Sequence, residues 1–244
     1  MGESMKNNIK DILQLSVEEL KSKVGKTKYE IFLNIFKMLL LFFSLWILFV
    51  HFLGFNVLKN SYPYVLWLLS GFVPCIYVLD VLIGSFKYKY DKPFEVINLS
   101  SFILFSILTF IEIIIFRICG YEIDFYYFGI IVYMILSFVF LQLCSILIIN
   151  IGKISEKLNQ FLYLFLIPVI CFSGLFFSKA DLHNKILKMF LKINPIYYLI
   201  HGFRKSLIYK KGLFTQPVLF ANFIIVNIVI ILICFILNKL NKRK

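Results

Sequence analysis

Eight basic side chains gather in one stretch, Lys179–Gly212, where a single acid, Asp181, accompanies them. The cations are Lys179, Lys185, Lys188, Lys192, Arg204, Lys205, Lys210 and Lys211. Such a density of ammonium and guanidinium groups suits the binding of anions. Two kinds of anion fit, the phosphates of lipid headgroups and a polyanionic polymer, and the sequence leaves both open.

Side chains that could catalyse a reaction are few and scattered. His51, His183 and His201 stand alone, without the paired spacing that binds zinc. The run Gly25–Thr27 lacks the glycine that a phosphate-binding loop needs about five residues earlier. We therefore predict no catalytic residue, no metal site and no cofactor on this chain. Any energy for its work is expected to come from a gradient or from another subunit.

The composition is that of a membrane protein. Of the 244 residues, 61% are hydrophobic, and the mean hydropathy is +0.88. Soluble domains are only about 45–50% apolar. The formal net charge is +13. Lysines at the ends of membrane spans and beside anionic lipid account for this charge, so no nucleic-acid partner is expected.

Six apolar runs predict an all-α integral membrane protein with six transmembrane helices, since a span needs about 20 residues. They are Ile31–Phe55, Tyr64–Ile83, Val96–Cys119, Phe125–Ile149, Phe161–Phe177 and Pro217–Leu237. Lysines gather before the first run and after the second, fourth and sixth, whereas Glu122 and Asp124 follow the third. The positive-inside rule therefore predicts that both termini are cytoplasmic.

Residues 1–28 form a separate region ahead of the first span. Apolar residues from Ile9 to Val24 recur there at helical spacing, with charged residues between them. This pattern predicts an amphipathic helix that lies in the membrane interface or against a partner. Residues 29–244 are expected to form the six-helix transmembrane domain.

The basic segment 179–212 is too weakly apolar to cross a membrane, because its apolar part, Ile193–Phe203, is only about half the length of a span. Asn194-Pro195 is a natural break, since proline disfavours helix at the residue before it. We predict a pair of short re-entrant helices between spans five and six, Asp181–Ile193 with Asp181 as N-cap, and Pro195–Tyr209.

Two charged residues, Glu112 and Arg117, fall inside the third apolar run. An ionisable residue within a span is a functional candidate by default. Glu112 could serve transport or helix packing, and Arg117 could extend its charge to the outer surface.

Four stretches carry a family resemblance. They are ELKSKVGKTKYEIFLNIFKMLL (Glu19–Leu40), YPYVLWLLSGFVP (Tyr62–Pro74), SGLFFS (Ser173–Ser178) and INPIYYLIHGFRKSL (Ile193–Leu207). In this order, with six spans, they resemble the type-2 ABC exporter permeases and in particular the polysaccharide branch. That branch exports lipid-linked glycans of the O-antigen, capsule and wall teichoic acid types.

The resemblance implies partners and a place in the cell. It implies a homodimer joined to two copies of a separately encoded ATPase subunit, which would carry ATP and Mg²⁺. The location would be the bacterial cytoplasmic (inner) membrane, and the cargo would be a lipid-linked glycan surrounded by membrane lipid. One departure is the stretch after span four, NIGKISEKLNQ, where Lys153 and Glu156 stand in place of the family's Arg-Asp pair.

The resemblance also implies two groups of functional residues. The first would contact the ATPase from the amphipathic helix and from the loop between spans two and three: Glu18, Glu19, Phe86, Tyr88, Lys89, Asp91 and Glu95. The second would lie at the exit of the glycan channel: Asn194, Pro195, Tyr197, Tyr198, Phe203 and Arg204.

Two alternatives stay open. A type-2 ABC permease for a small hydrophobic compound or a peptide would share the fold and the ATPase. A membrane-embedded glycan transferase would need a histidine or acid cluster at one membrane face, which the sequence does not display.

Overall fold

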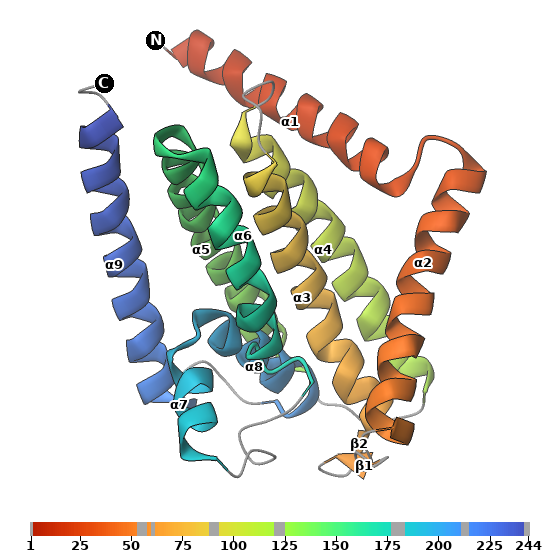
Figure 1. The fold of residues 1–244 in the computed structure, drawn as a ribbon. Coiled ribbons are helices and arrows are strands. Elements are labelled where there is room, and N and C mark those ends of the chain that lie inside the picture. The colour runs from red at the N-terminus through yellow and green to blue at the C-terminus, as the bar shows by residue number, and fades with distance from the viewer. Residues whose placement is uncertain are drawn as a thin grey trace.

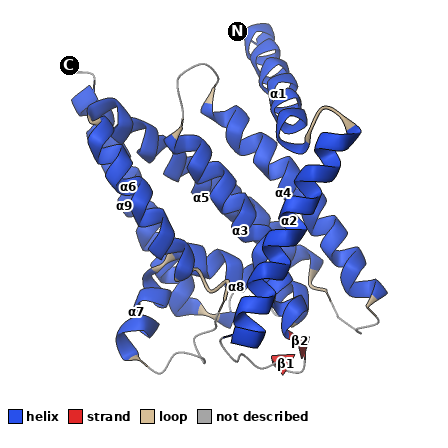
Figure 2. Cartoon of the chain, turned by 45° about the vertical axis from the view of Figure 1, so that its right-hand side comes forward, coloured by secondary structure: helices blue, strands red, loops and turns tan. Residues whose placement is uncertain are grey.

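The computed structural model describes residues 2–52, 58–59, 62–87, 93–119, 125–176, 184–210 and 215–241. Within this part of the chain the fold is helical, apart from one antiparallel pair of two-residue strands (Figure 2). The prediction of an all-α protein is therefore confirmed. The elements are α1 (Gly2–Val24), α2 (Lys28–Ile47), a π-helical turn (Leu48–Phe52), β1 (Leu58–Lys59), β2 (Tyr62–Pro63), α3 (Tyr64–Phe86), α4 (Phe94–Ile118), α5 (Tyr127–Ile154), α6 (Glu156–Cys171), α7 (Lys185–Ile193), α8 (Pro195–Ile208) and α9 (Pro217–Asn241).

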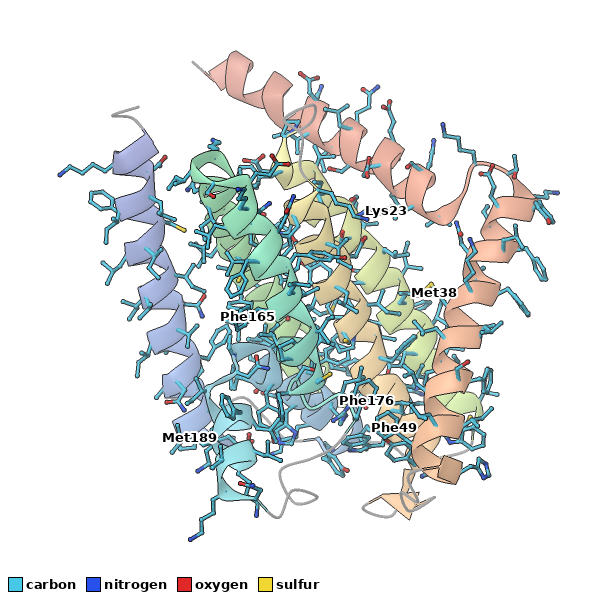
Figure 3. All side chains as sticks on the ribbon, in the orientation of Figure 1. Lys23, Met38, Phe49, Phe165, Phe176 and Met189 are labelled. Carbon is cyan, nitrogen blue, oxygen red and sulfur yellow. The ribbon has the colours of Figure 1, made fainter. Side chains whose placement is uncertain are left out.

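Helix α3 lies at the centre of the bundle and packs against α4, α5 and α8. In its most apolar stretch of 18 residues 72% are buried, whereas the corresponding share is 6% for Lys28–His51, which includes α2, and 11% for α9. A helix that is apolar on all sides is stable only when other helices or lipid surround it. The exposed apolar side chains of α2 and α9 are therefore available to lipid or to another protein (Figure 3).

Buried polar side chains join α3, α4 and α5 by hydrogen bonds. The Tyr77 hydroxyl on α3 donates to Asn98 Oδ1 on α4 over 2.8 Å, and Asn98 Nδ2 donates to Gln142 Oε1 on α5 over 2.6 Å. The hydroxyls of Ser85 and Ser145 are 2.8 Å apart. Buried polar groups that satisfy one another fix the register of neighbouring helices. These three helices therefore form one cross-linked block.

Helix α8 is short but almost wholly buried, because glycines allow it to approach the block closely. A Cβ on Gly202 would collide with the Tyr133 ring, and one on Gly129 would collide with the Ser206 side chain. On α3, a Cβ on Gly71 would occupy the place of the Arg204 guanidinium. The only fully compatible residue at these crossings is the one without a side chain.

Five helices in the described part of the chain are long and apolar enough to cross a membrane: Lys28–His51, α3, α4, α5 and Pro217–Lys239 within α9. The run predicted as span five corresponds to α6, which has 16 residues and carries Pro168 near its end. At 1.5 Å per residue it is about 24 Å long, less than the about 30 Å of a hydrocarbon core. The six-span count thus stays a prediction.

Both chain ends lie at one end of the bundle, while α7 and α8 lie at the opposite end (Figure 1). The helix pair agrees with the predicted break at Asn194-Pro195, because α7 ends at Ile193 and α8 begins at Pro195. The start of α7, the first helix of this pair, differs from the prediction. Its N-cap is Asn184, whose side chain accepts from the backbone N–H of Ile186, and Asp181 lies outside the described residues. Re-entry into a membrane stays a prediction.

Helix α1 lies across the end of the bundle that carries the termini and packs against α4 (Figure 1). A tight elbow joins it to α2. Gly25 has φ 122°, which suits glycine, and Thr27 forms a capping box with Glu30 at the start of α2. Asn34 donates to the carbonyls of Lys23 and Val24, so the last carbonyls of α1 are satisfied.

Candidate functional site

Among the residues that the structure describes, Arg204 on α8 is the largest side chain that is fully buried, with 1% of its surface exposed. Its Nε donates to Ser70 Oγ over 3.1 Å, and its two terminal nitrogens donate to the carbonyls of Gly174 and Leu175 over 2.9 and 3.3 Å. Its Cζ lies 3.6 Å from the centre of the Trp67 ring. A cation over an indole face is attracted by the ring quadrupole. We call Arg204 and these four partners the Arg204 site.

Asn194 joins the end of α6 to the start of α8. Its Oδ1 accepts from the backbone N–H of Ile196 over 3.0 Å, which caps α8. Its Nδ2 donates to the carbonyls of Val169 and Phe172, each over 2.8 Å. Pro195 occupies the first turn of α8, where its fixed φ fits and no N–H is needed. The Asn194 side chain therefore satisfies backbone groups both at the end of α6 and at the start of α8.

The turn after α6 is also held by α3 and by the π-helical turn that follows α2. The Tyr64 hydroxyl at the start of α3 donates to the carbonyl of Phe176 over 2.9 Å. The Phe176 ring stacks on Phe49 at 4.5 Å between centres, and the two rings lie together near the end of α2 (Figure 3). The start of α3, the turn after α6 and helix α8 thus meet at one place.

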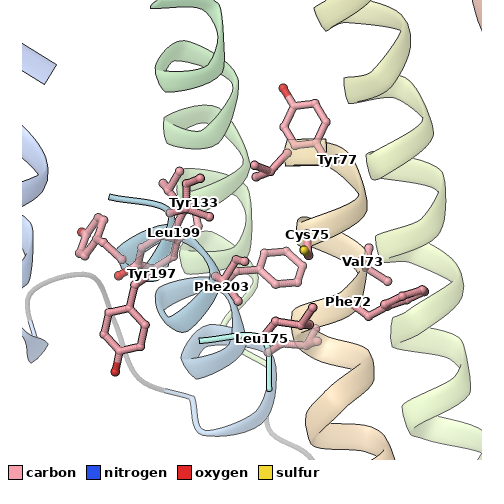
Figure 4. Packing of buried hydrophobic residues seen from close by; sticks show 14 of the residues in the cluster. Phe72, Val73, Cys75, Tyr77, Tyr133, Leu175, Tyr197, Leu199 and Phe203 are labelled. Carbon is pink, nitrogen blue, oxygen red and sulfur yellow. The ribbon is translucent and has the colours of Figure 1, made fainter. Parts of the chain in front are cut away.

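The remaining residues predicted at the channel exit lie inside the subunit. Tyr197, Tyr198 and Phe203 are each at most 3% exposed. Tyr198 packs among Tyr133, Phe220 and Phe223, while Phe203 points from α8 toward Cys75 on α3 (Figure 4). In this conformation none of the three rings is presented on the surface, and Tyr198 and Phe203 pack α8 against neighbouring helices.

Glu112 on α4 is 1% exposed, and neither carboxyl oxygen has a hydrogen-bond partner among the described residues. It lies near the level of the Arg204 site. Tyr77 on α3 stacks on Phe105 of the antiparallel α4 at 4.8 Å, and a further two turns along each helix lead to Ser70 and Glu112. The structure therefore places this buried acid on the same layer as the buried guanidinium, without joining them.

Arg117, the other charged residue of this run, lies at the exposed end of α4. Its Nη2 donates to the Tyr127 hydroxyl over 2.9 Å, and its guanidinium lies 5.7 Å from the centre of the Phe125 ring. These contacts join α4 to the start of α5. Arg117 and Glu112 are not joined by any described ion pair.

The predicted ATPase-contacting residues fall into two groups. Tyr88, Lys89 and Asp91 lie outside the described residues. The others lie at the end of the bundle that carries the termini (Figure 1): Glu18 and Glu19 on α1, Phe86 at the end of α3 and Glu95 in the first turn of α4. Glu18 is exposed and accepts from Gln14 over 3.5 Å.

Sequence reasoning missed an ion pair that fastens α1 to the bundle. Lys23 Nζ lies 2.7 Å from Asp80 Oδ2 on α3 and 2.7 Å from Ser101 Oγ on α4, and the serine hydroxyl donates to the same carboxylate oxygen. Lys23 projects from α1 toward these helices (Figure 3). The signal was present, because Asp80 is the one acid within the run Tyr64–Ile83. We call Lys23, Asp80 and Ser101 the α1 anchor.

Helix α7 separates basic from apolar side chains. Lys185, Lys188 and Lys192 follow helical spacing on one face, while four apolar side chains are about half exposed or more: Ile186, Met189, Phe190 and Ile193. Met189 lies on the outer side of the helix (Figure 3). No acid occurs anywhere after Asp181. This pattern is typical of a helix at a membrane surface.

The sequence comparison agrees with this arrangement. The family model described as ABC-2 type transporter matches residues 11–208, which include both the α1 anchor and the Arg204 site. The protein therefore belongs to the ABC-2 type transporter family and is a membrane subunit of an ABC transporter, a class that works with an ATPase subunit. No curated protein gives a significant match to the chain.

The first prediction concerns Arg204. Arg204→Met should lower the free energy of unfolding by about 1–3 kcal/mol for each acceptor that loses its donor. Arg204→Lys should restore only part of it, because an ammonium cannot reproduce the planar guanidinium that contacts a ring and three oxygens. Thermal denaturation in detergent measures the effect. Arg117→Met, at an exposed arginine, serves as control and should change little. Equal effects for the two methionine variants would contradict the assignment.

The second prediction concerns Glu112. Glu112→Leu should stabilise the protein by about 1–3 kcal/mol, because it removes a buried polar group that has no partner. Glu112→Gln should stabilise it less, since the amide remains polar. Glu95→Leu on the same helix should not stabilise it, because a carboxylate is favourable in the first turn. The same denaturation assay applies. A fall in the melting midpoint of Glu112→Leu would show that the carboxyl has a stabilising partner.

Proposed function

We propose that this protein is the membrane subunit of an ATP-driven exporter that moves a lipid-linked polysaccharide across the bacterial cytoplasmic membrane. The cargo class is an O-antigen, capsule or teichoic acid type of glycan. The working unit is a homodimer with two copies of a separately encoded ATPase, and both termini face the cytoplasm. The family membership supports the transporter class, and the features below support the finer assignment.

The observation that carries the proposal is the meeting of the three stretches that resemble polysaccharide permeases. Tyr64 and Ser70 come from YPYVLWLLSGFVP, Gly174 and Leu175 from SGLFFS, and Arg204 from INPIYYLIHGFRKSL. Ser70 and Arg204 are 134 residues apart in sequence, and Gly174 and Arg204 are 30 apart. The three stretches nevertheless contact one another through Arg204 and Tyr64. The three stretches therefore supply residues to one site, which gives a physical reason for their occurring together in one sequence.

This site suits a gate better than a surface for cargo. The guanidinium is buried, its hydrogen bonds go to backbone carbonyls and a hydroxyl, and the neighbouring tyrosines are packed inside the subunit. Moving a polar polymer through lipid requires a lined path, because desolvating each polar group costs several kcal/mol. In our proposal α7 and α8 close the outer end of this path and shift as a unit when it opens.

The third prediction tests the function itself. Deleting the gene should remove the surface glycan and cause its lipid-linked precursor to accumulate on the cytoplasmic side, as measured by extraction and electrophoresis. Purification of the tagged protein should recover an ATPase subunit. Recovery of the ATPase with unchanged surface glycan would favour the alternative cargo, a small hydrophobic compound or a peptide. Absence of any ATPase would reject the exporter.

The fourth prediction concerns the lysine row of α7. We propose that Lys185, Lys188 and Lys192 guide a polyanionic glycan as it leaves, since complementary charge speeds encounter and is screened by salt. Replacing all three by glutamine should slow export, and the loss should shrink in high salt. As control, the exposed lysines Lys21, Lys26 and Lys28 at the other end of the bundle are replaced in the same way. Unchanged export by the α7 variant would assign this row to lipid headgroups.

A further inference from the structure

The α1 anchor and the Arg204 site are both built on helix α3. Asp80, which binds Lys23, and Ser70, which binds Arg204, are ten residues apart on this helix. At 1.5 Å per residue this separation is about 15 Å along the axis. One helix therefore carries a polar contact to α1 toward one end and a polar contact to α8 toward the other.

The helix between these two contacts cannot slide easily against its neighbours. Tyr77, which lies between Ser70 and Asp80, is bonded through Asn98 to α4 and onward to α5. The Tyr77 ring also stacks on Phe105, which in turn packs on Phe203 of α8. Close-packed interiors transmit displacement because they have few voids to absorb it. A displacement of α3 is thus expected to reach α8.

The attachment of α1 is of a different kind. Leu13 and Val17 are more than 40% exposed, so part of its apolar face does not pack on the bundle. At the elbow, Asn34 binds α1 only through backbone carbonyls. The α1 anchor adds a charge-assisted contact of one side chain with α3 and α4 together. Charge-assisted hydrogen bonds are about twice as strong as neutral ones.

From these contacts we infer that Asp80 is a positioning residue that couples α1 to the gate. When α1 is displaced by a partner, Lys23 draws Asp80 and Ser101 with it, so that α3 and α4 follow. Arg204 then carries the movement of α3 into α8. The inference rests on the proposed function, because it assigns a route from the ATPase side of the subunit to the outer end.

The experiment uses the complete transporter with its ATPase and measures glycan exported per ATP hydrolysed. Lys23→Asp and Asp80→Lys should each lower this ratio by at least about fivefold, which is the lower range of ordinary coupling between sites. The double variant Lys23→Asp/Asp80→Lys should recover most of the ratio, because the pair is restored with its charges exchanged. Lys21→Asp, an exposed lysine in the same turn of α1, serves as the matched control and should leave the ratio unchanged.

Two further measurements keep the result decisive. Melting midpoints and the amount of ATPase recovered with each variant should match those of the wild type, since Asp80 is about a third exposed. If single variants kept the wild-type ratio, or if the double variant remained as poor as either single one, the coupling role would be wrong. A wild-type complex that hydrolyses ATP but exports no glycan would instead reject the proposed function and leave the α1 anchor to be measured with another cargo.

Discussion

The buried guanidinium of Arg204 is the constraint on which the end of the bundle that contains α7 and α8 depends. A cation in a low-dielectric interior is tolerated only when its donors are satisfied, and here a hydroxyl, two carbonyls and an indole face meet that need. To supply them, α3 must present Ser70 and Trp67, and the turn after α6 must aim its carbonyls inward. The need for close approach explains Gly71, since any side chain there would occupy the place of the guanidinium.

The opposite end of the bundle follows another rule. There the chain folds back through a capped elbow, so that α1 lies across the helices and reaches them with the Lys23 ammonium. This contact is partly exposed and is therefore easier to break than the Arg204 site. The proposed transport cycle needs both kinds of contact, since in it α7 and α8 must be held firmly as a gate while α1 receives force and must move. Helix α3 lies between the two and is cross-linked to α4 and α5 by buried polar groups.

Polar groups inside this protein fall into two classes. In the first class, Tyr77 on α3, Asn98 on α4 and Gln142 on α5 bond to one another, as do Ser85 and Ser145, and these contacts set the helix register. The second class has no such partners. Glu112 and Thr109 lie one turn apart on α4, and both are buried without a partner among the described residues. These two unsatisfied groups lower the stability of the layer that also contains Arg204. A subunit that is held together by satisfied contacts thus retains an unsatisfied acid, Glu112, in the same layer as its buried cation.

The sequence by itself determined the class of the protein. Long apolar runs require helices in a membrane, since backbone groups in lipid must bond within their own segment, and Asn194-Pro195 dictates the boundary between α7 and α8. The resemblance of four stretches pointed to the family, and the match to residues 11–208 confirmed it. The predicted bounds of α7 and α6 were less accurate. The start of α7 depends on capping by the Asn184 side chain, and α6 is a short helix with Pro168 near its end. Only the tertiary structure decided which residues meet. Arg204 with Ser70, and Lys23 with Asp80, are separated by 134 and 57 residues. No local periodicity records such pairs, because they result from how helices pack rather than from how each one forms.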